Sequence, residues 1–188
     1  MPKVKTRRND ILRRKEIVAT LKKANKLKQP WGSALPCIIA IAWLFGKRIS
    51  EILRVKRQDI WVREGYLYIR FFVSKKKARK DVPVPKPYLK RITLNHEGTK
   101  IVLAYLKTLT QDKLFPHMSR ELAWYYLKKV NKKVWWHLFR ESLATEMAER
   151  GATEEKLMHW FDWDRVDTAH SYVKRGTKLT EELSERTW

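Results

Sequence analysis

The sequence of 188 residues has a single cysteine, Cys37, so no disulfide can form within the chain. Disulfides belong to oxidising compartments, and we therefore expect a reducing one, the cytoplasm. The longest apolar run, residues 34–45, is too short to span a bilayer and predicts a buried helix. The N-terminus is charged and has no apolar stretch of the kind that a secretory signal requires.

Motifs for metal and nucleotide chemistry are also missing. The five histidines form no HExxH pair, and a CxxC pair cannot exist with one cysteine. The chain has no GxxxxGK[ST] loop to hold nucleotide phosphates and no GxSxG turn around a nucleophilic serine. We therefore expect no metal, no cofactor and no small-molecule substrate, so that any chemistry on phosphates depends on side chains alone.

Acidic residues are few relative to basic ones. The chain has 20 Asp and Glu against 42 Lys and Arg, a formal net charge of +22. Such an excess indicates a polyanionic partner, because each phosphate that a basic side chain neutralises releases condensed counterions. We interpret the partner as double-stranded DNA; a membrane surface, or merely an unusual composition, is the alternative. Within the basic segment 1–28, we expect DNA contacts from Arg7, Arg8, Arg13 and Arg14.

Hydrophobic patterns indicate mostly helices and one small sheet. Helical spacing recurs in six segments, 11–29, 34–53, 98–109, 119–132, 137–150 and 153–160. Residues 66–73 are rich in aromatic and β-branched side chains, which predicts a strand, and 81–85 predicts a short returning strand at a sheet edge. A short segment ending near Tyr172 and a separate helix at 180–188 complete the pattern. The predicted fold is α+β and mainly α-helical, with a small antiparallel β-sheet.

One basic pair lies on a single helical face. His137 and Arg140 are three residues apart in the predicted helix 137–150. Metal-free phosphoryl transfer needs a nucleophile, cationic donors for the non-bridging oxygens and an acid for the leaving oxygen. Arginine suits the second task, because its planar fork matches phosphate geometry and stays charged. Alone, however, such a pair is more often a solvated surface feature.

The pair gains weight because four segments, in order, resemble the motifs of tyrosine recombinases, the phage-type integrases. Gly46–Leu53 resembles G-x-R-x-S-E-[IL]-L, and His137–Thr145 resembles H-x-L-R-H-[ST]-x-A-T. Residues 161–163 stand where the family has L-G-[HW], and Tyr172 follows at the family's usual distance from its nucleophile. Between the first two motifs lies a strand–turn–strand with a basic turn, where the family carries a catalytic lysine. The resemblance covers roughly residues 11–175.

The resemblance implies an enzyme that cuts and rejoins DNA through a 3′-phosphotyrosyl bond, with no metal or ATP. In site-specific recombination or DNA integration of this kind, Tyr172 would attack the scissile phosphate. Arg48 and Arg140 would bind that phosphate, and His137 would hydrogen-bond it and assist proton transfer. Trp163 occupies a position that is His in many members; its indole N–H can donate a hydrogen bond but cannot shuttle a proton.

The resemblance also assigns protonation of the leaving 5′-oxygen to a lysine of the basic turn. Aligning Val82-Pro83 with the family's returning strand favours Lys75 as this acid, with Lys76 and Lys77 as adjacent alternatives. We expect Lys76, Lys77 and Arg79 to bind DNA.

Two positions depart from the family pattern. Glu141 replaces the usual His after the second arginine, and Asp162 replaces the Gly before Trp163. Both changes bring negative charge near the phosphate site. A relative that only binds DNA is therefore one alternative to the recombinase, and a type IB topoisomerase, which shares the chemistry without exchanging partners, is another.

We expect a basic arm at 1–10, the catalytic domain at 11–176 and a tail at 177–188 that docks on a neighbouring subunit. The resemblance implies a homo-oligomer, a tetramer on paired sites. Larger integrases carry an N-terminal domain that closes around DNA. The chain would therefore be either part of a longer protein or similar to the short fimbrial-switch type.

Overall fold

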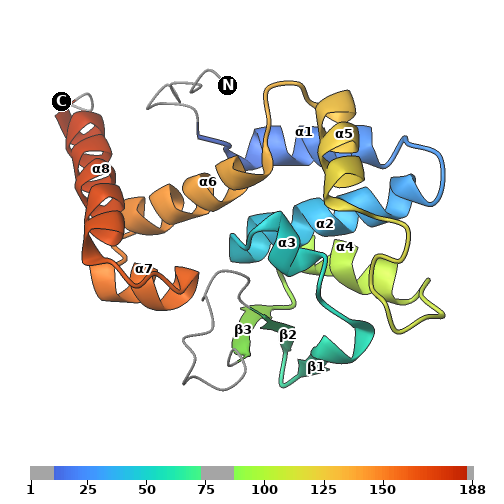
Figure 1. The fold of residues 1–188 in the computed structure, drawn as a ribbon. Coiled ribbons are helices and arrows are strands. Elements are labelled where there is room, and N and C mark those ends of the chain that lie inside the picture. The colour runs from blue at the N-terminus through green and yellow to red at the C-terminus, as the bar shows by residue number, and fades with distance from the viewer. Residues whose placement is uncertain (1–10, 73–86, 186–188) are drawn as a thin grey trace.

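The computed structural model describes residues 11–72 and 87–185 (Figure 1). Its elements are α1 (Arg14–Ala24), α2 (Trp31–Phe45), α3 (Ile49–Ile52), the 3-10 turn η1 (Arg57–Asp59), β1 (Ile60–Arg63), β2 (Tyr66–Phe71), β3 (Tyr88–Thr93), α4 (Glu97–Leu106), α5 (Arg120–Val130), α6 (Trp136–Glu149), α7 (Glu154–Phe161) and α8 (Val166–Glu185). The fold is α+β and mainly helical, as predicted. The helices predicted between residues 98 and 160 are confirmed as α4 to α7, with slightly different ends.

Helix α2 forms the centre of the fold. Every residue from Ala34 to Phe45 is buried, which confirms the interpretation of the apolar run as a buried helix. Helices α1, α4, α5 and α6 pack around it (Figure 1). α2 ends at Gly46, whose φ of 59° lies in the left-handed region that glycine adopts without cost. A Cβ there would also lie 2.5 Å from the Phe161 ring, so glycine allows the end of α7 to approach the end of α2.

The three strands form one antiparallel sheet in the order β1-β2-β3. Leu67, Ile69 and Phe71 alternate along β2 and are fully buried, and the Phe71 ring lies 5.5 Å from that of Phe45 in α2. The predicted strand at 66–73 is thus confirmed as β2, whereas β1 and β3 were not predicted. β3 begins at Tyr88, which pairs with Phe71. The returning strand predicted at 81–85 lies outside the described residues.

Helix α8 packs along α6 and α7 and closes a second, smaller core that contains Ala144, Leu157 and Phe161 (Figure 1). The prediction of a short segment near Tyr172 followed by a separate helix is wrong, because α8 runs unbroken from Val166 to Glu185. Gly176 does not interrupt it; a Cβ there would lie 2.7 Å from the Ala148 carbonyl carbon, so glycine allows α8 to approach α6. Within residues 11–72 and 87–185, no helix combines the length and apolar character that a bilayer crossing demands.

Candidate active site

The structure brings residues of the four matched segments together in one region. Arg48 is the N-cap of α3, and Arg140 lies on α6. Trp163 lies in the turn between α7 and α8, and Tyr172 is near the start of α8. His137, in the first turn of α6, is the most exposed of the group, with 57% of its side chain accessible.

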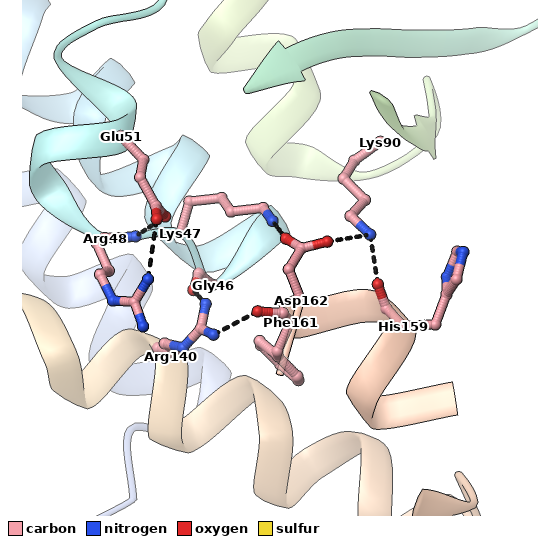
Figure 2. A network of polar contacts seen from close by, with 9 residues as sticks. All are labelled: Gly46, Lys47, Arg48, Glu51, Lys90, Arg140, His159, Phe161 and Asp162. Atoms are coloured by element: carbon pink, nitrogen blue, oxygen red, sulfur yellow. Dashed lines mark hydrogen bonds and ion pairs between the residues drawn. The ribbon is translucent and has the colours of Figure 1, made fainter. Parts of the chain in front are cut away.

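Arg140 is the buried centre of this region, with 2% of its surface exposed. Its Nη1 donates to the Gly46 carbonyl at 2.8 Å and its Nη2 to the Phe161 carbonyl at 2.6 Å (Figure 2). These carbonyls lie at the C-terminal ends of α2 and α7, where a cation is electrostatically favoured. Burial, and then the nearby Arg48 charge, lower the pKa of Arg140 to about 10, which still leaves it protonated at neutral pH. Arg140 is therefore a cation whose orientation is fixed by two helix ends.

Arg48 is held in place by Glu51. The buried Glu51 carboxylate accepts the Arg48 backbone N–H at 2.9 Å and Nη1 at 3.0 Å (Figure 2). About a third of the Arg48 side chain, 34%, remains exposed. A capping carboxylate thus fixes the start of α3 and the direction of the arginine together. The two arginines repel each other in the free protein, and an anion between them would relieve that repulsion.

Three aromatic rings form a continuous stack beside Arg140. The ring centroids of Phe161 and Trp163 are 4.8 Å apart, and those of Trp163 and Tyr172 are 5.2 Å apart with planes at 14°. The Arg140 guanidinium lies over the Trp163 ring at 5.4 Å, and Arg175 lies over the Tyr172 ring at 5.4 Å. The Tyr172 ring therefore contacts both an indole and a cation.

The charges around Tyr172 act in opposite directions. Burial raises the pKa of its phenol, and the negative charge of Glu141 raises it further, whereas Arg175 and Arg140 lower it. Burial also raises the pKa of the Glu141 carboxyl, which Arg175 opposes. Glu141 lies 3.8 Å from Nε2 of His137, one turn away on α6. Glu141 is therefore part of the site's electrostatics, which its departure from the family pattern had indicated.

The expected DNA contacts are placed only in part. Arg13 binds both carboxylate oxygens of Glu149, at 2.6 and 2.8 Å, and Arg14 binds both of Glu97, at 2.9 Å each. The structure thus places these two arginines in ion pairs within the protein. The remaining predicted residues lie outside the described part of the chain: Arg7, Arg8, Lys75, Lys76, Lys77 and Arg79. Among the described residues, no group of three His, Cys, Asp or Glu could hold a metal ion.

Two lysines that the sequence did not single out contact Asp162. Lys47 hydrogen-bonds one oxygen of the Asp162 carboxylate, and the Lys90 ammonium lies 3.3 Å from the other (Figure 2). The negative charge that Asp162 adds to the site is thus neutralised within the protein. No local sequence pattern indicated these contacts, because β3 was not predicted and the three residues lie far apart in the sequence.

A model of the phage integrase family matches residues 10–178. The chain belongs to this family. Tyrosine recombinase XerA of Pyrococcus furiosus is 26% identical over 156 residues, which cover 79% of this chain and 53% of the relative. Tyrosine recombinase XerD of Staphylococcus epidermidis is 25% identical over 183 residues, which cover 92% and 60%. The chain therefore spans about half to 60% of the length of these curated relatives.

Solved recombinase structures share the fold. The XerH site-specific recombinase, in a post-cleavage complex with its palindromic difH substrate, superposes with a TM-score of 0.71 at 16% identity, over 93% of this chain and 52% of that one. The catalytic domain of bacteriophage HP1 integrase gives 0.62 at 15% identity, over 87% and 86%. The family and fold class predicted from the sequence are confirmed.

Proposed function

We propose that this chain forms the catalytic domain of a site-specific DNA recombinase that cleaves and rejoins DNA through a 3′-phosphotyrosyl intermediate. The observation that carries the proposal is the packing of Tyr172 against Trp163, with the Arg140 guanidinium also over the Trp163 ring and Arg48 close by. A nucleophile and two cations drawn from three separate helices meet in one place, as an attack on a phosphodiester requires.

In the proposed reaction, the Tyr172 oxygen attacks phosphorus and forms a new phosphate ester as the bond to the 5′-oxygen breaks. Arg48 and Arg140 donate to the two non-bridging oxygens, whose charge grows in the transition state. Arg140 needs little reorganisation for this, because two carbonyls already orient it. The phosphotyrosyl ester conserves the energy of the broken bond, so that a 5′-hydroxyl can reverse the step without ATP.

Proton transfer is divided among the remaining residues. His137, on the exposed rim of α6, hydrogen-bonds the phosphate and assists removal of the phenol proton. Lys75 protonates the leaving 5′-oxygen. Trp163 donates its indole N–H, since an indole has no second role in proton transfer.

The proposed partner is double-stranded DNA, and the proposed assembly is a tetramer on paired sites. The formal charge of +22 and the XerH complexes with difH support the DNA partner. Residues 177–188 are the segment that we propose docks on a neighbouring subunit, with residues 1–10 as a basic arm along the DNA.

Covalent trapping tests the proposal. Selection from a pool of random duplexes supplies a bound site, which is then nicked beside the scissile bond so that the released 5′-hydroxyl fragment diffuses away. We expect an adduct that survives detergent, forms in EDTA without ATP and maps to the Tyr172 peptide by mass spectrometry. Binding without any adduct would reject the enzyme in favour of a protein that only binds DNA.

The topoisomerase alternative needs a second assay on the same protein. A recombinase exchanges strands between two labelled duplexes that both carry the selected site. A type IB topoisomerase relaxes a supercoiled plasmid without a paired site and produces no recombinant duplex. Relaxation without strand exchange would indicate a type IB topoisomerase instead of a recombinase. The proposed attack by Tyr172 on the phosphate would be the same in either enzyme.

A further inference from the structure

Asp162 has an unusual backbone conformation at the end of α7. Its φ of 55° and ψ of 46° lie in the left-handed region, which glycine enters freely and Asp or Asn enter more readily than other side chains. The Met158 carbonyl accepts the backbone N–H of Asp162 and also that of Trp163, the latter at 3.0 Å. The turn thus ends α7 and begins the approach to α8 with a carboxylate where a glycine would suffice.

That carboxylate is buried between two buried ammonium groups. The side chains of Lys47, Asp162 and Lys90 are 1%, 7% and 5% exposed. Lys90 also donates to the His159 carbonyl at 2.6 Å, in the last turn of α7 (Figure 2). Two cations and one anion leave an excess positive charge in a poorly solvated place, and burial lowers the pKa of Lys47 despite the neighbouring carboxylate. Apolar residues would often pack as well at lower desolvation cost.

Two of the three members directly precede an expected catalytic residue, and the third lies on β3. Lys47 directly precedes Arg48, and Asp162 directly precedes Trp163. Lys90 lies on β3, the strand that follows the basic turn with Lys75 in the sequence. The cluster therefore links three segments of the chain whose relative positions matter for the proposed reaction.

Resting on the proposed function, we infer that Asp162, held by Lys47 and Lys90, is a positioning residue for the nucleophile. It fixes the turn of Trp163 relative to the Arg48 segment and to β3. The Trp163 ring in turn packs face to face on Tyr172, so the position of the phenol depends on the position of this turn. Arg140 holds the preceding carbonyl of the same turn, and the carboxylate supplies a second, independent attachment.

A first test needs no DNA. Tetranitromethane nitrates accessible tyrosines, and peptide mass spectrometry measures the rate at each one. In Asp162→Asn, which keeps the shape and tolerates the left-handed backbone, we expect Tyr172 to react several-fold faster than in the wild type. Lys90→Met should also speed the nitration of Tyr172. The nitration rate of Tyr125, which is 53% exposed and serves as an internal reference, should not change in either variant. Unchanged nitration of Tyr172 in both variants would overturn the inference.

Matched controls come from an exposed ion pair. Lys56 and Asp112 lie 4.0 Å apart with side chains 56% and 60% exposed. Lys56→Met and Asp112→Asn repeat the same chemical changes away from the turn and should leave the nitration of Tyr172 at the wild-type rate. Faster nitration in these controls would trace the effect to charge in general and would also overturn the inference.

The second test separates positioning from stability. With saturating DNA, Asp162→Asn should form adduct about 10–100-fold more slowly than the wild type, the scale of a displacement of about 1 Å at a reacting group, with DNA affinity unchanged. The compensated variant Asp162→Gly/Lys47→Leu/Lys90→Met removes all three charges and should regain thermal stability, yet keep fast nitration and slow cleavage. Recovery of nitration and cleavage along with stability would make the cluster purely structural. If the wild type forms no adduct, the proposed function fails, and nitration still decides the inference.

Discussion

The indole of Trp163 lies face to face with the phenol of Tyr172, the two centroids 5.2 Å apart. The two residues come from different elements, the turn after α7 and the helix α8. An indole offers one N–H and a broad apolar face, whereas an imidazole offers little surface to pack on. In this chain, Trp163 therefore packs its ring on that of the proposed nucleophile, a contact that an imidazole at this position would make less extensively.

Tyr172→Phe keeps this stack and removes only the attacking oxygen. We expect no covalent adduct, with DNA affinity and melting temperature close to those of the wild type. Trapping on the nicked duplex, together with thermal unfolding, measures both outcomes. An adduct that persists would point to another tyrosine such as Tyr125 or Tyr126 on α5; Tyr126 packs on Trp31 instead, with ring centroids 4.9 Å apart.

The two arginines should differ in what their loss does to the fold. Arg48→Met and Arg140→Met should each slow cleavage by about 10²–10³-fold, the scale for one preorganised donor to a developing oxyanion. Arg140→Met should lower the melting temperature because the buried carbonyls of Gly46 and Phe161 lose their donor, at about 1–3 kcal/mol for each group left unsatisfied. Arg48→Met should lower it for a different reason, because the buried Glu51 carboxylate loses its side-chain partner and keeps only the backbone N–H.

Single-turnover cleavage and calorimetry check this pair of variants. A cleavage rate within tenfold of the wild type would remove the arginine concerned from phosphate binding. A wild-type melting temperature for Arg140→Met would mean that the two carbonyl hydrogen bonds contribute nothing to stability.

Glu141 should set the pH dependence of cleavage. Its negative charge raises the pKa of Tyr172, second to burial, so it disfavours the phenolate. Glu141→Gln removes that contribution, lowers the pKa of Tyr172, and should shift the rising limb of the pH–rate profile to lower pH. Glu146→Gln, on the same helix in an ion pair with Arg150, is the control and should leave the profile in place. A profile that stays where it was in Glu141→Gln would dismiss the carboxylate as an influence on the nucleophile.

The sequence predicted the elements that local pattern determines. The apolar run of α2, the strand β2 and the spacing of His137 and Arg140 on α6 each follow from periodicity within a few turns. The segment that forms α8 was divided in error; Gly176 lies inside the continuous helix, where the lack of a side chain lets α8 approach α6. β3 was missed because its one fully inward side chain is Lys90, a charged residue where a strand pattern expects an apolar one.

Motif order was enough to propose Arg48, Arg140 and Tyr172 as site residues, but not to predict the contacts that hold them. No local pattern could show that Arg140 donates to the carbonyls of Gly46 and Phe161 at two helix ends, since these residues lie 94 and 21 positions away in the sequence. For the same reason, the sequence could not show that the charge of Asp162 is neutralised by Lys47 and Lys90.

The basic arm should contribute through charge alone. DNA affinity should fall steeply with salt, and removal of residues 1–10 should make the slope shallower by about 0.9 per lost phosphate contact. Fluorescence anisotropy over a range of salt concentrations measures the slope for both proteins. Identical slopes would mean that Arg7 and Arg8 do not reach the DNA.

The last prediction concerns Lys75, which the sequence favours over its two lysine neighbours as the acid for the leaving oxygen. Strand alternation sends adjacent side chains to opposite faces, so an extended chain beyond β2 would put Lys75 and Lys77 on one face and Lys76 on the other. The alignment of Val82-Pro83 then favours Lys75. A duplex with a 5′-phosphorothiolate at the scissile bond distinguishes them, because its sulfur leaves without a proton.

Lys75→Ala should cleave ordinary DNA about 10²–10⁴-fold more slowly, the range for loss of a general acid, and should be largely rescued on the sulfur substrate. Lys76→Ala and Lys77→Ala are matched controls in the same turn. Their cleavage rates should fall less, and the fall should grow with salt concentration. The sulfur substrate should not restore the rate, since a lost phosphate contact does not depend on the leaving group. Rescue at Lys77 would shift the register of the turn by two residues. Rescue at none of the three would require the proton to come from a different part of the site.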